Sequence, residues 1–253
     1  MAKNKIALVT GGSRGLGKNM ALRLAQAGHD VIITYQTQKE AADAVVAEME
    51  GLGRKAEALQ LDSLLIASLN DFISELSKTL QSKWSVSTFD FLINNAGIGA
   101  TIPFEQVTEE EFDKFLNIHF KSVYFLTQRA LSLMNNGGSI VNISTGTTRF
   151  CVPGYSVYAS MKGAIETFTR YLAKEVGGRG ITANAVAPGP IETDFNNAAI
   201  RNNPDRKKIM ASQTALGRVG EAADVGGIVA FLCSEDAHWI NAQRIEASGG
   251  INL

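Results

Sequence analysis

Residues 6–17 read IALVTGGSRGLG, and this segment is the strongest indication of the fold class. Its first half is a short apolar run typical of a buried strand, and its second half is glycine-rich and opens a helical pattern. Glycines in such a turn let the backbone bend sharply and let a pyrophosphate approach the helix N-terminus, where free N–H groups favour anions. The spacing Gly11-x-x-x-Gly15-x-Gly17 is one residue longer than the general dinucleotide fingerprint. The stretch predicts a dinucleotide site, with a plain strand-to-helix connector as the alternative.

Outward from this turn, short apolar runs alternate with longer helical patterns. The expected strands lie at 6–10, 31–35, 56–61, 89–94, 139–143, 182–187 and 243–247, and the expected helices at 15–27, 38–52, 66–80, 109–134, 155–176 and 222–234. The strand runs are nearly continuously apolar, which is typical of strands buried on both faces. The alternation predicts an α/β protein in which one domain, residues 1–253, forms a Rossmann-type doubly wound parallel sheet of about seven strands with helices on both faces. The polar segment at about 190–214 is expected to be a substrate lid, or a plain surface excursion.

The composition excludes several classes of protein. The 253 residues, 45% of them hydrophobic, fit one large α/β domain. A formal net charge of −1 argues against a nucleic-acid or membrane-surface partner. Two cysteines are too few for a disulfide framework, and the scattered histidines suggest no metal site. No secretory segment or membrane-spanning run is visible, so a cytoplasmic enzyme is expected.

The end of the second expected strand indicates which dinucleotide binds. An Asp or Glu at this place would bind the adenosine ribose hydroxyls and select NAD. The sequence instead has Tyr35 here and no acid before Glu40, whereas Arg14 and Lys39 could both pair with a 2′-phosphate. NADP(H) is therefore the expected cofactor, although Lys39 alone could equally be a solvated side chain.

A Tyr–Lys pair carries the chemistry. Tyr158 and Lys162 are four residues apart and share one face of an expected helix. An ammonium near a phenol favours the phenolate, so Tyr158 could exchange a proton near neutral pH. Tyr35 and Lys39 have the same spacing, but only Tyr158 follows a strand that ends in a hydroxyl residue, Thr145. The context predicts a general acid/base, with a surface pair as the alternative.

Two further strand ends carry small residues or prolines. Asn94-Asn95-Ala96-Gly97 closes the fourth expected strand, where small side chains leave room for a ligand against the backbone. Pro188 and Gly189 close the sixth and could cap the nicotinamide end of a cofactor. A turn signal is the alternative interpretation of both.

Together these motifs resemble the short-chain dehydrogenase/reductase family over residues 10–250. The resemblance rests on Thr-Gly-x-x-x-Gly-x-Gly at 10–17, Asn-Asn-Ala-Gly at 94–97, Tyr-x-x-x-Lys at 158–162 and Pro-Gly at 188–189. The 3-oxoacyl-(acyl-carrier-protein) reductase-like members are the most similar, through residues 179–193. The resemblance implies an NADP(H)-dependent oxidoreductase acting on CH–OH groups, which interconverts a carbonyl and a secondary alcohol.

Residue roles follow from the same resemblance. Tyr158 is the implied acid/base, and Lys162 lowers its pKa and holds the nicotinamide ribose. Asn117 anchors a proton-relay water through its helix, and Thr145 stands where the family has a substrate-orienting Ser. Asp62 is expected at the adenine, Asn94 and Gly97 at the adenosine ribose, and Ile191 and Thr193 at the nicotinamide carboxamide. The full cofactor set is Gly11, Ser13, Arg14, Gly15, Leu16, Gly17, Tyr35, Lys39, Asp62, Ser63, Asn94, Ala96, Gly97, Tyr158, Lys162, Pro188, Gly189, Ile191 and Thr193.

Substrate and partners are less constrained by the sequence. A 3-oxoacyl thioester or similar ketone is the expected substrate, and the alternatives are a sugar, polyol or cyclic-alcohol dehydrogenase. Arg179 is expected near the pocket mouth, and Arg149, Phe150, Val152 and Tyr155 suggest an apolar wall with one cation. Two helices that are apolar more than halfway round, at 112–126 and 165–172, favour a partner subunit, with core helices covered by a loop of the same chain as the alternative. The resemblance implies a homotetramer assembled through these two helices. Thr145 leaves open a non-catalytic NADP(H)-sensing binding protein.

Overall fold

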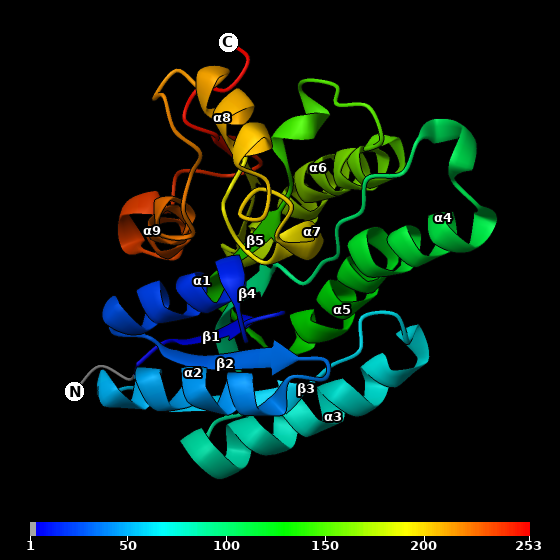
Figure 1. Ribbon diagram of the computed structural model, residues 1–253. Coiled ribbons are helices and arrows are strands. Elements are labelled where there is room, and N and C mark those ends of the chain that lie inside the picture. The colour runs from blue at the N-terminus through cyan, green and yellow to red at the C-terminus, as the bar shows by residue number, and fades with distance from the viewer. Residues whose placement is uncertain (1–3) are drawn as a thin grey trace.

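The computed structural model describes residues 4–253, and a seven-stranded parallel sheet forms its centre (Figure 1). The strand order is β3-β2-β1-β4-β5-β6-β7. The strands are β1 (Ile6–Val9), β2 (Asp30–Tyr35), β3 (Ala56–Gln60), β4 (Phe89–Asn94), β5 (Met134–Ile143), β6 (Thr182–Pro188) and β7 (Arg244–Ala247). The doubly wound α/β sheet expected from the sequence is confirmed.

Helices cover both faces of the sheet, because alternate strand residues point to opposite sides. In β1, Ala7 and Val9 join one core and Ile6 and Leu8 join the other. The first core contains residues of α1 (Gly15–Gln26), α2 (Lys39–Gly51) and α9 (Ala223–Leu232). The second contains residues of α3 (Leu69–Thr79), α5 (Ser122–Ala130) and α6 (Ser156–Val176). No helix among residues 4–253 is long and apolar enough to cross a membrane.

The expected helix at 109–134 is interrupted in the structure. It divides into α4 (Glu109–Leu116), a π-helical turn η4 (Asn117–Lys121) and α5, and the chain then enters β5 at Met134. A π turn inserts one residue into the helical repeat and so rotates the side chains that follow it. The turn η4 lies beside the candidate site, and two of its residues line the cavity there.

A crevice opens where the strand order reverses, between β1 and β4. The loops that follow these two strands are joined by hydrogen bonds through Thr10. Its hydroxyl accepts from the backbone N–H groups of Asn95 at 2.9 Å and Ala96 at 3.0 Å, and Asn95 Nδ2 donates to the Thr10 carbonyl at 2.9 Å. The glycine turn (residues 10–17) and the Asn-Asn-Ala-Gly segment are thereby held together at the crevice.

The segment 190–214 contains two short helices, α7 (Phe195–Ala198) and α8 (Pro204–Ser212). Two ion pairs hold this segment: Lys207 Nζ lies 2.5 Å from Glu192 and Arg201 Nη1 lies 2.6 Å from Asp194. Residues from both helices line the same cavity as the strand ends. The segment therefore covers the carboxyl ends of the central strands.

Candidate active site

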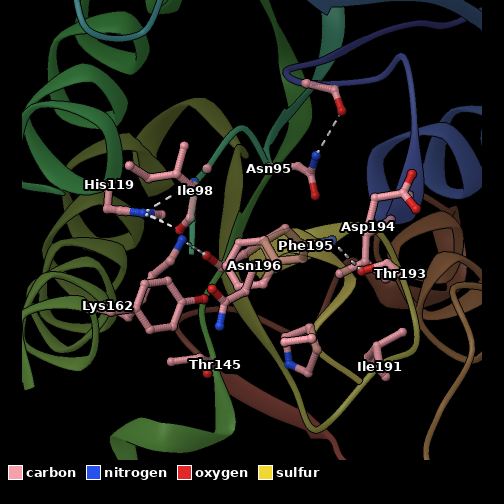
Figure 2. Close-up of a pocket in the computed structure, with 18 of the residues that line it drawn as sticks. Asn95, Ile98, His119, Thr145, Lys162, Ile191, Thr193, Asp194, Phe195 and Asn196 are labelled. Atoms are coloured by element: carbon pink, nitrogen blue, oxygen red, sulfur yellow. Dashed lines mark hydrogen bonds between the residues drawn. The ribbon is translucent and has the colours of Figure 1, made fainter. Parts of the chain in front are cut away.

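A cavity of about 690 Å³ lies at the carboxyl ends of the central strands, where a doubly wound sheet places its ligand site. Figure 2 shows Thr145, Lys162 and His119 on one side of this space and Ile191 and Thr193 on the other. The sequence-predicted residues that line it are Gly11, Ser13, Arg14, Gly15, Leu16, Gly17, Tyr35, Asp62, Ser63, Ala96, Gly97, Thr145, Tyr158, Lys162, Pro188, Gly189, Ile191 and Thr193. Lys39, Asn94 and Asn117 are not part of the wall.

The glycine turn has the shape that a pyrophosphate needs. Gly11 and Gly15 adopt φ of +66° and +56°, which L side chains rarely adopt. A Cβ on Gly17 would lie 2.1 Å from the Gly11 carbonyl oxygen, so only glycine lets α1 start against the turn. No side chain caps the N-terminus of α1 at Arg14. Its first N–H groups are therefore free to bind an anion at the cavity wall.

The adenosine end of the cavity separates the two predicted cations. Arg14 lines it beside Tyr35 and Asp62, and Asp62 Oδ1 accepts a hydrogen bond from Gln36 Nε2 at 3.0 Å. Lys39 instead forms an i,i+4 ion pair with Asp43, at 2.6 Å, on the outer surface of α2. A 2′-phosphate would thus meet Arg14.

Asn94 is not placed as the sequence suggested. Its side chain is buried, and Nδ2 donates to Thr127 at 3.0 Å and to Asn142 at 2.8 Å. The alternation along β4 turns Asn94 towards α5, away from the crevice. Asn95, one residue later, lines the cavity in its place.

Tyr158 is a buried phenol in the cavity wall. Burial raises its pKa above the ordinary value, and a hydrogen bond with Thr145 opposes the rise without cancelling it. Its ring packs against Phe115, His119 and Phe195, with centroid separations of 6.4, 5.1 and 5.9 Å. The phenol therefore carries its proton at neutral pH, as a general acid must.

Lys162 lies one helical turn after Tyr158 and is also buried. Its ammonium donates to the Ile143 carbonyl at 2.7 Å, and Nζ is 5.8 Å from the Tyr158 ring centroid. Burial lowers the pKa of Lys162 to about 8. Burial is the largest cause of the raised pKa of Tyr158, and the lowering of this pKa by Lys162 stays a prediction.

The helix beside the pair presents His119, not Asn117. His119 is fully buried in the cavity wall, and Nε2 hydrogen-bonds to the Ile98 carbonyl at 2.8 Å. Burial, with the nearby Lys162 charge, lowers the pKa of His119 well below 6.5, so the ring is neutral. Its Nδ1 atom has no hydrogen-bond partner in the part of the chain that the structure describes. Asn117 begins the π turn and lies outside the wall.

A signal for His119 was present in the sequence. His119 is four residues after the buried Phe115, so the two fall on one helical stripe, and their rings stack in the structure. Residues 117 and 119 point in roughly opposite directions on a helix, so only one of them can face the cavity. The stripe would have favoured the histidine.

Comparisons with known proteins agree with this geometry. A family model described as Enoyl-(Acyl carrier protein) reductase matches residues 11–252. The chain belongs to the short-chain dehydrogenase/reductase family. A hydroxynaphthalene reductase-like protein of Metarhizium robertsii is 35% identical over an alignment of 257 positions, which covers 97% of this chain and 94% of that protein.

Solved structures show the same relationship. The reductase LugOII, described as catalysing keto-reduction at C1 during lugdunomycin biosynthesis, has 38% identity and a TM-score of 0.93, with 98% of this chain and 97% of that chain covered. The angucycline C-6 ketoreductase LanV, solved with bound NADP, has 36% identity and a TM-score of 0.94, with coverage of 98% and 96%. This short-chain dehydrogenase/reductase is therefore an oxidoreductase.

Two cations expected at the substrate pocket of this short-chain dehydrogenase/reductase lie elsewhere. Arg149 makes two hydrogen bonds to Glu246, at 2.7 and 2.6 Å, and also donates to the carbonyl oxygens of Ile251 and Asn252. Arg179 donates to Asn136 at 2.9 Å and to two carbonyl oxygens beside it. Neither arginine lines the cavity. The structure places no group of three or more His, Cys, Asp or Glu side chains that could hold a metal within residues 4–253.

The two hydroxyl residues at the end of β5 have separate roles. Ser144 donates to Glu166 at 2.6 Å, and Glu166 also pairs with Arg244 at 2.7 Å, so Ser144 belongs to a structural polar network. Thr145 points to the other side and meets Tyr158. The alternation of strand side chains explains the division.

Substitution at Thr145 is expected to damage turnover more than substitution at Ser144. Thr145→Ala removes a donor to the substrate oxygen and should lower kcat by about 10²-fold. Thr145→Ser keeps the hydroxyl and should stay within about fivefold of wild type. Ser144→Ala should lower the melting temperature while kcat changes little, since a hydrogen bond to a charged group contributes about 1.5–3 kcal/mol. Steady-state kinetics with thermal melts separates these results, and a kcat loss confined to Ser144→Ala would contradict the assignment.

Proposed function

We propose that this short-chain dehydrogenase/reductase is an NADPH-dependent ketoreductase that converts a cyclic aromatic ketone to its secondary alcohol. The observation that carries the proposal is a buried, protonated Tyr158 beside Thr145 at the base of a cavity with apolar outer walls. The walls are formed by Phe150, Val152, Phe195, Ile200, Ile209 and Met210. The hydroxynaphthalene reductase-like relative supports an aromatic substrate, and the ketoreductases LugOII and LanV support reduction of a ketone.

The cofactor is NADP(H). Several solved relatives hold NADP or NADPH. This chain has Tyr35 rather than an acid at the end of β2, and Arg14 lines the cavity beside it. We assign the pyrophosphate to the glycine turn and the nicotinamide end to Pro188, Ile191 and Thr193. A reduced nicotinamide held there supplies the hydride that reaches the carbonyl carbon.

The protein's part in the reaction is orientation and proton transfer. Thr145 donates a hydrogen bond to the ketone oxygen, and Tyr158 gives the same oxygen its proton as the hydride arrives at carbon. The Lys162 ammonium stabilises the negative charge left on the Tyr158 oxygen. The neutral His119 holds the loop at Ile98 against this centre. The segment 190–214 acts as a lid that excludes water from the reaction.

A 3-oxoacyl thioester is the second candidate substrate, because the matching family model is described by an acyl-carrier-protein activity. The position of Arg179 away from the cavity weakens this candidate, since a carrier protein would need cations at the mouth. The apolar walls disfavour a sugar or polyol. The burial of Tyr158 and Lys162 together in the cavity wall, with Thr145 in the same wall, disfavours a cofactor sensor without turnover.

A panel of carbonyl substrates tests the proposal. NADPH oxidation should be faster with 1-tetralone and larger polycyclic ketones than with acetoacetyl thioesters, crotonyl thioesters or ketoses, and faster than the same reactions with NADH. Fastest turnover with a thioester ketone would replace the aromatic substrate with an acyl one. Tight NADPH binding with no turnover on any compound would support a sensor.

Assembly and location remain proposals. Tyr124 and Tyr171 are exposed on α5 and α6, and Tyr124 stacks on Phe168 with a centroid separation of 4.8 Å. These aromatic side chains border a groove between the two helices, also lined by Phe120 and Gly163. We propose that this face joins protomers into the homotetramer expected from the sequence. The cytoplasmic location stays a prediction.

A further inference from the structure

The end of the cavity beyond Tyr158 contains a cluster of four polar side chains. Arg206 Nη2 donates to the Tyr155 hydroxyl oxygen at 3.0 Å, and Asn196 Nδ2 donates to the same oxygen at 3.1 Å. Thr101 Oγ1 lies 3.4 Å from that oxygen and 3.2 Å from Asn196 Nδ2. These residues, here named the distal cluster, all line the cavity.

Hydrogen-bond donors outnumber acceptors in the distal cluster. A guanidinium brings five N–H donors and no acceptor, an amide brings two donors, and each hydroxyl brings one. The hydroxyl oxygen of Tyr155 already accepts hydrogen bonds from both Arg206 and Asn196. Thr101 Oγ1 accepts a second hydrogen bond from Asn196, so most of the guanidinium N–H groups of Arg206 remain available to an acceptor oxygen of a ligand.

The charge of Arg206 is also uncompensated. Its neighbours in the lid are paired, Lys207 with Glu192 and Arg201 with Asp194. Arg206 has no carboxylate within ion-pair distance among residues 4–253. A cation that faces a partly apolar cavity without a counter-ion favours an anionic oxygen in the ligand.

The distal cluster lies about one ring away from the reaction centre. The rings of Tyr155 and Tyr158 have centroids 6.2 Å apart, and Phe195 packs on Tyr158 from the lid at 5.9 Å. Figure 2 shows Phe195 and Asn196 over the same space as Thr145 and Lys162. A fused aromatic ketone can therefore place its carbonyl at Tyr158 and a substituent of the next ring at Arg206.

We propose that Arg206, supported by Tyr155 and Asn196, binds an anionic oxygen on the substrate, such as an ionised phenol or a carboxylate, one ring removed from the reacting carbonyl. The inference rests on the proposed ketoreductase function and adds the feature by which the enzyme selects among ketones. Arg206 is then a specificity-determining residue that leaves the chemistry at Tyr158 unchanged.

Two matched ketones test this assignment: 1-tetralone, and 1-tetralone with a carboxylate on its aromatic ring. Wild type should show a kcat/KM about 10–100-fold higher for the carboxylate, since hydrogen bonds to charged groups contribute about 1.5–3 kcal/mol. Arg206→Met should remove this preference and leave kcat/KM for 1-tetralone within about twofold. Arg206→Lys should restore part of the preference, because the charge returns without the planar fork. Lys208→Met, on the exposed side of α8, should behave as wild type.

Three outcomes decide the matter. The assignment is supported if Arg206→Met loses the carboxylate preference and Lys208→Met keeps it. Equal slowing of both ketones, or of neither, overturns it. If wild type turned over no ketone, the proposed function would fail. Calorimetric binding of the carboxylate ketone to the NADPH complex would then decide the role of Arg206. Binding to Arg206→Met that is at least about tenfold weaker supports this role, and unchanged affinity overturns it.

Discussion

Tyr158→Phe is expected to lower kcat for ketone reduction by about 10³-fold, within the range of about 10²–10⁴ that a positioned general acid contributes. The change removes only the hydroxyl. The ring contacts with Phe115, His119 and Phe195 remain, so the fold and the NADPH affinity should be retained. Stopped-flow or steady-state NADPH oxidation gives the rate, and fluorescence titration gives the NADPH dissociation constant.

The matched control for this change is Tyr171→Phe. Tyr171 lies on the same helix, is 68% exposed and is far from the cavity wall, so its loss of a hydroxyl should leave kcat unchanged. Near wild-type turnover in Tyr158→Phe would remove Tyr158 as the acid. A parallel loss of NADPH binding would point to a structural role.

Lys162→Met is expected to lower kcat by about 10²-fold while the melting temperature rises or stays the same. The ammonium no longer stabilises the charge that develops on the Tyr158 oxygen. Burial lowers the pKa of Lys162 from 10.5 to about 8, so holding its proton in the folded state costs free energy at every pH below about 8. That cost fades between about 8 and 10.5 as the unfolded chain loses its own proton. Methionine of similar length removes the cost without opening a cavity, and thermal melts at pH 7 with steady-state kinetics report both effects.

The same residue sets the pH dependence. Lys162 is charged below about pH 8 and neutral above it, so wild-type kcat/KM for ketone reduction should fall as pH rises through about 8. In Lys162→Met, kcat/KM should no longer fall as pH rises through about 8. Lys39→Met is the matched control, because it makes the same change in a Tyr–Lys pair of equal spacing. Lys39 is exposed and paired with Asp43, so this variant should keep the pH profile of kcat/KM and the NADPH affinity of wild type. A wild-type rate that stays constant to pH 10 would contradict the assignment.

Most of the fold follows from local patterns in the sequence. Continuous apolar runs predicted six strands to within one residue at each end, whereas β5 starts at Met134, five residues before the expected start at 139. The glycine turn located the crevice, because steric limits at Gly11 and Gly17 are local properties of the chain. Tyr158, Lys162 and Thr145 meet for the same reason: one strand end and one helical turn bring them together. Such short-range geometry can be inferred from spacing alone.

The errors have a common physical origin in side-chain direction. The alternation along β4 turns Asn94 into the core, and the stripe through Phe115 brings His119 rather than Asn117 to the cavity. Arg149 was expected at the substrate wall, but Glu246, 97 residues later in the chain, holds it at the C-terminal segment. Arg206 reaches the cavity from α8, and no motif marks it. Contacts between distant segments fix Arg149 and Arg206, which local patterns do not reveal.

The most direct test of hydride transfer to a carbonyl uses NADPH carrying deuterium at the transferable C4 position. Wild-type protein and a polycyclic ketone should give an alcohol with one deuterium on the carbinol carbon, located by NMR and mass spectrometry, and Tyr158→Phe should form this product about 10³-fold more slowly. Deuterium on a carbon of a former C=C bond, or NADPH consumption with no deuterium in the product, would contradict the account.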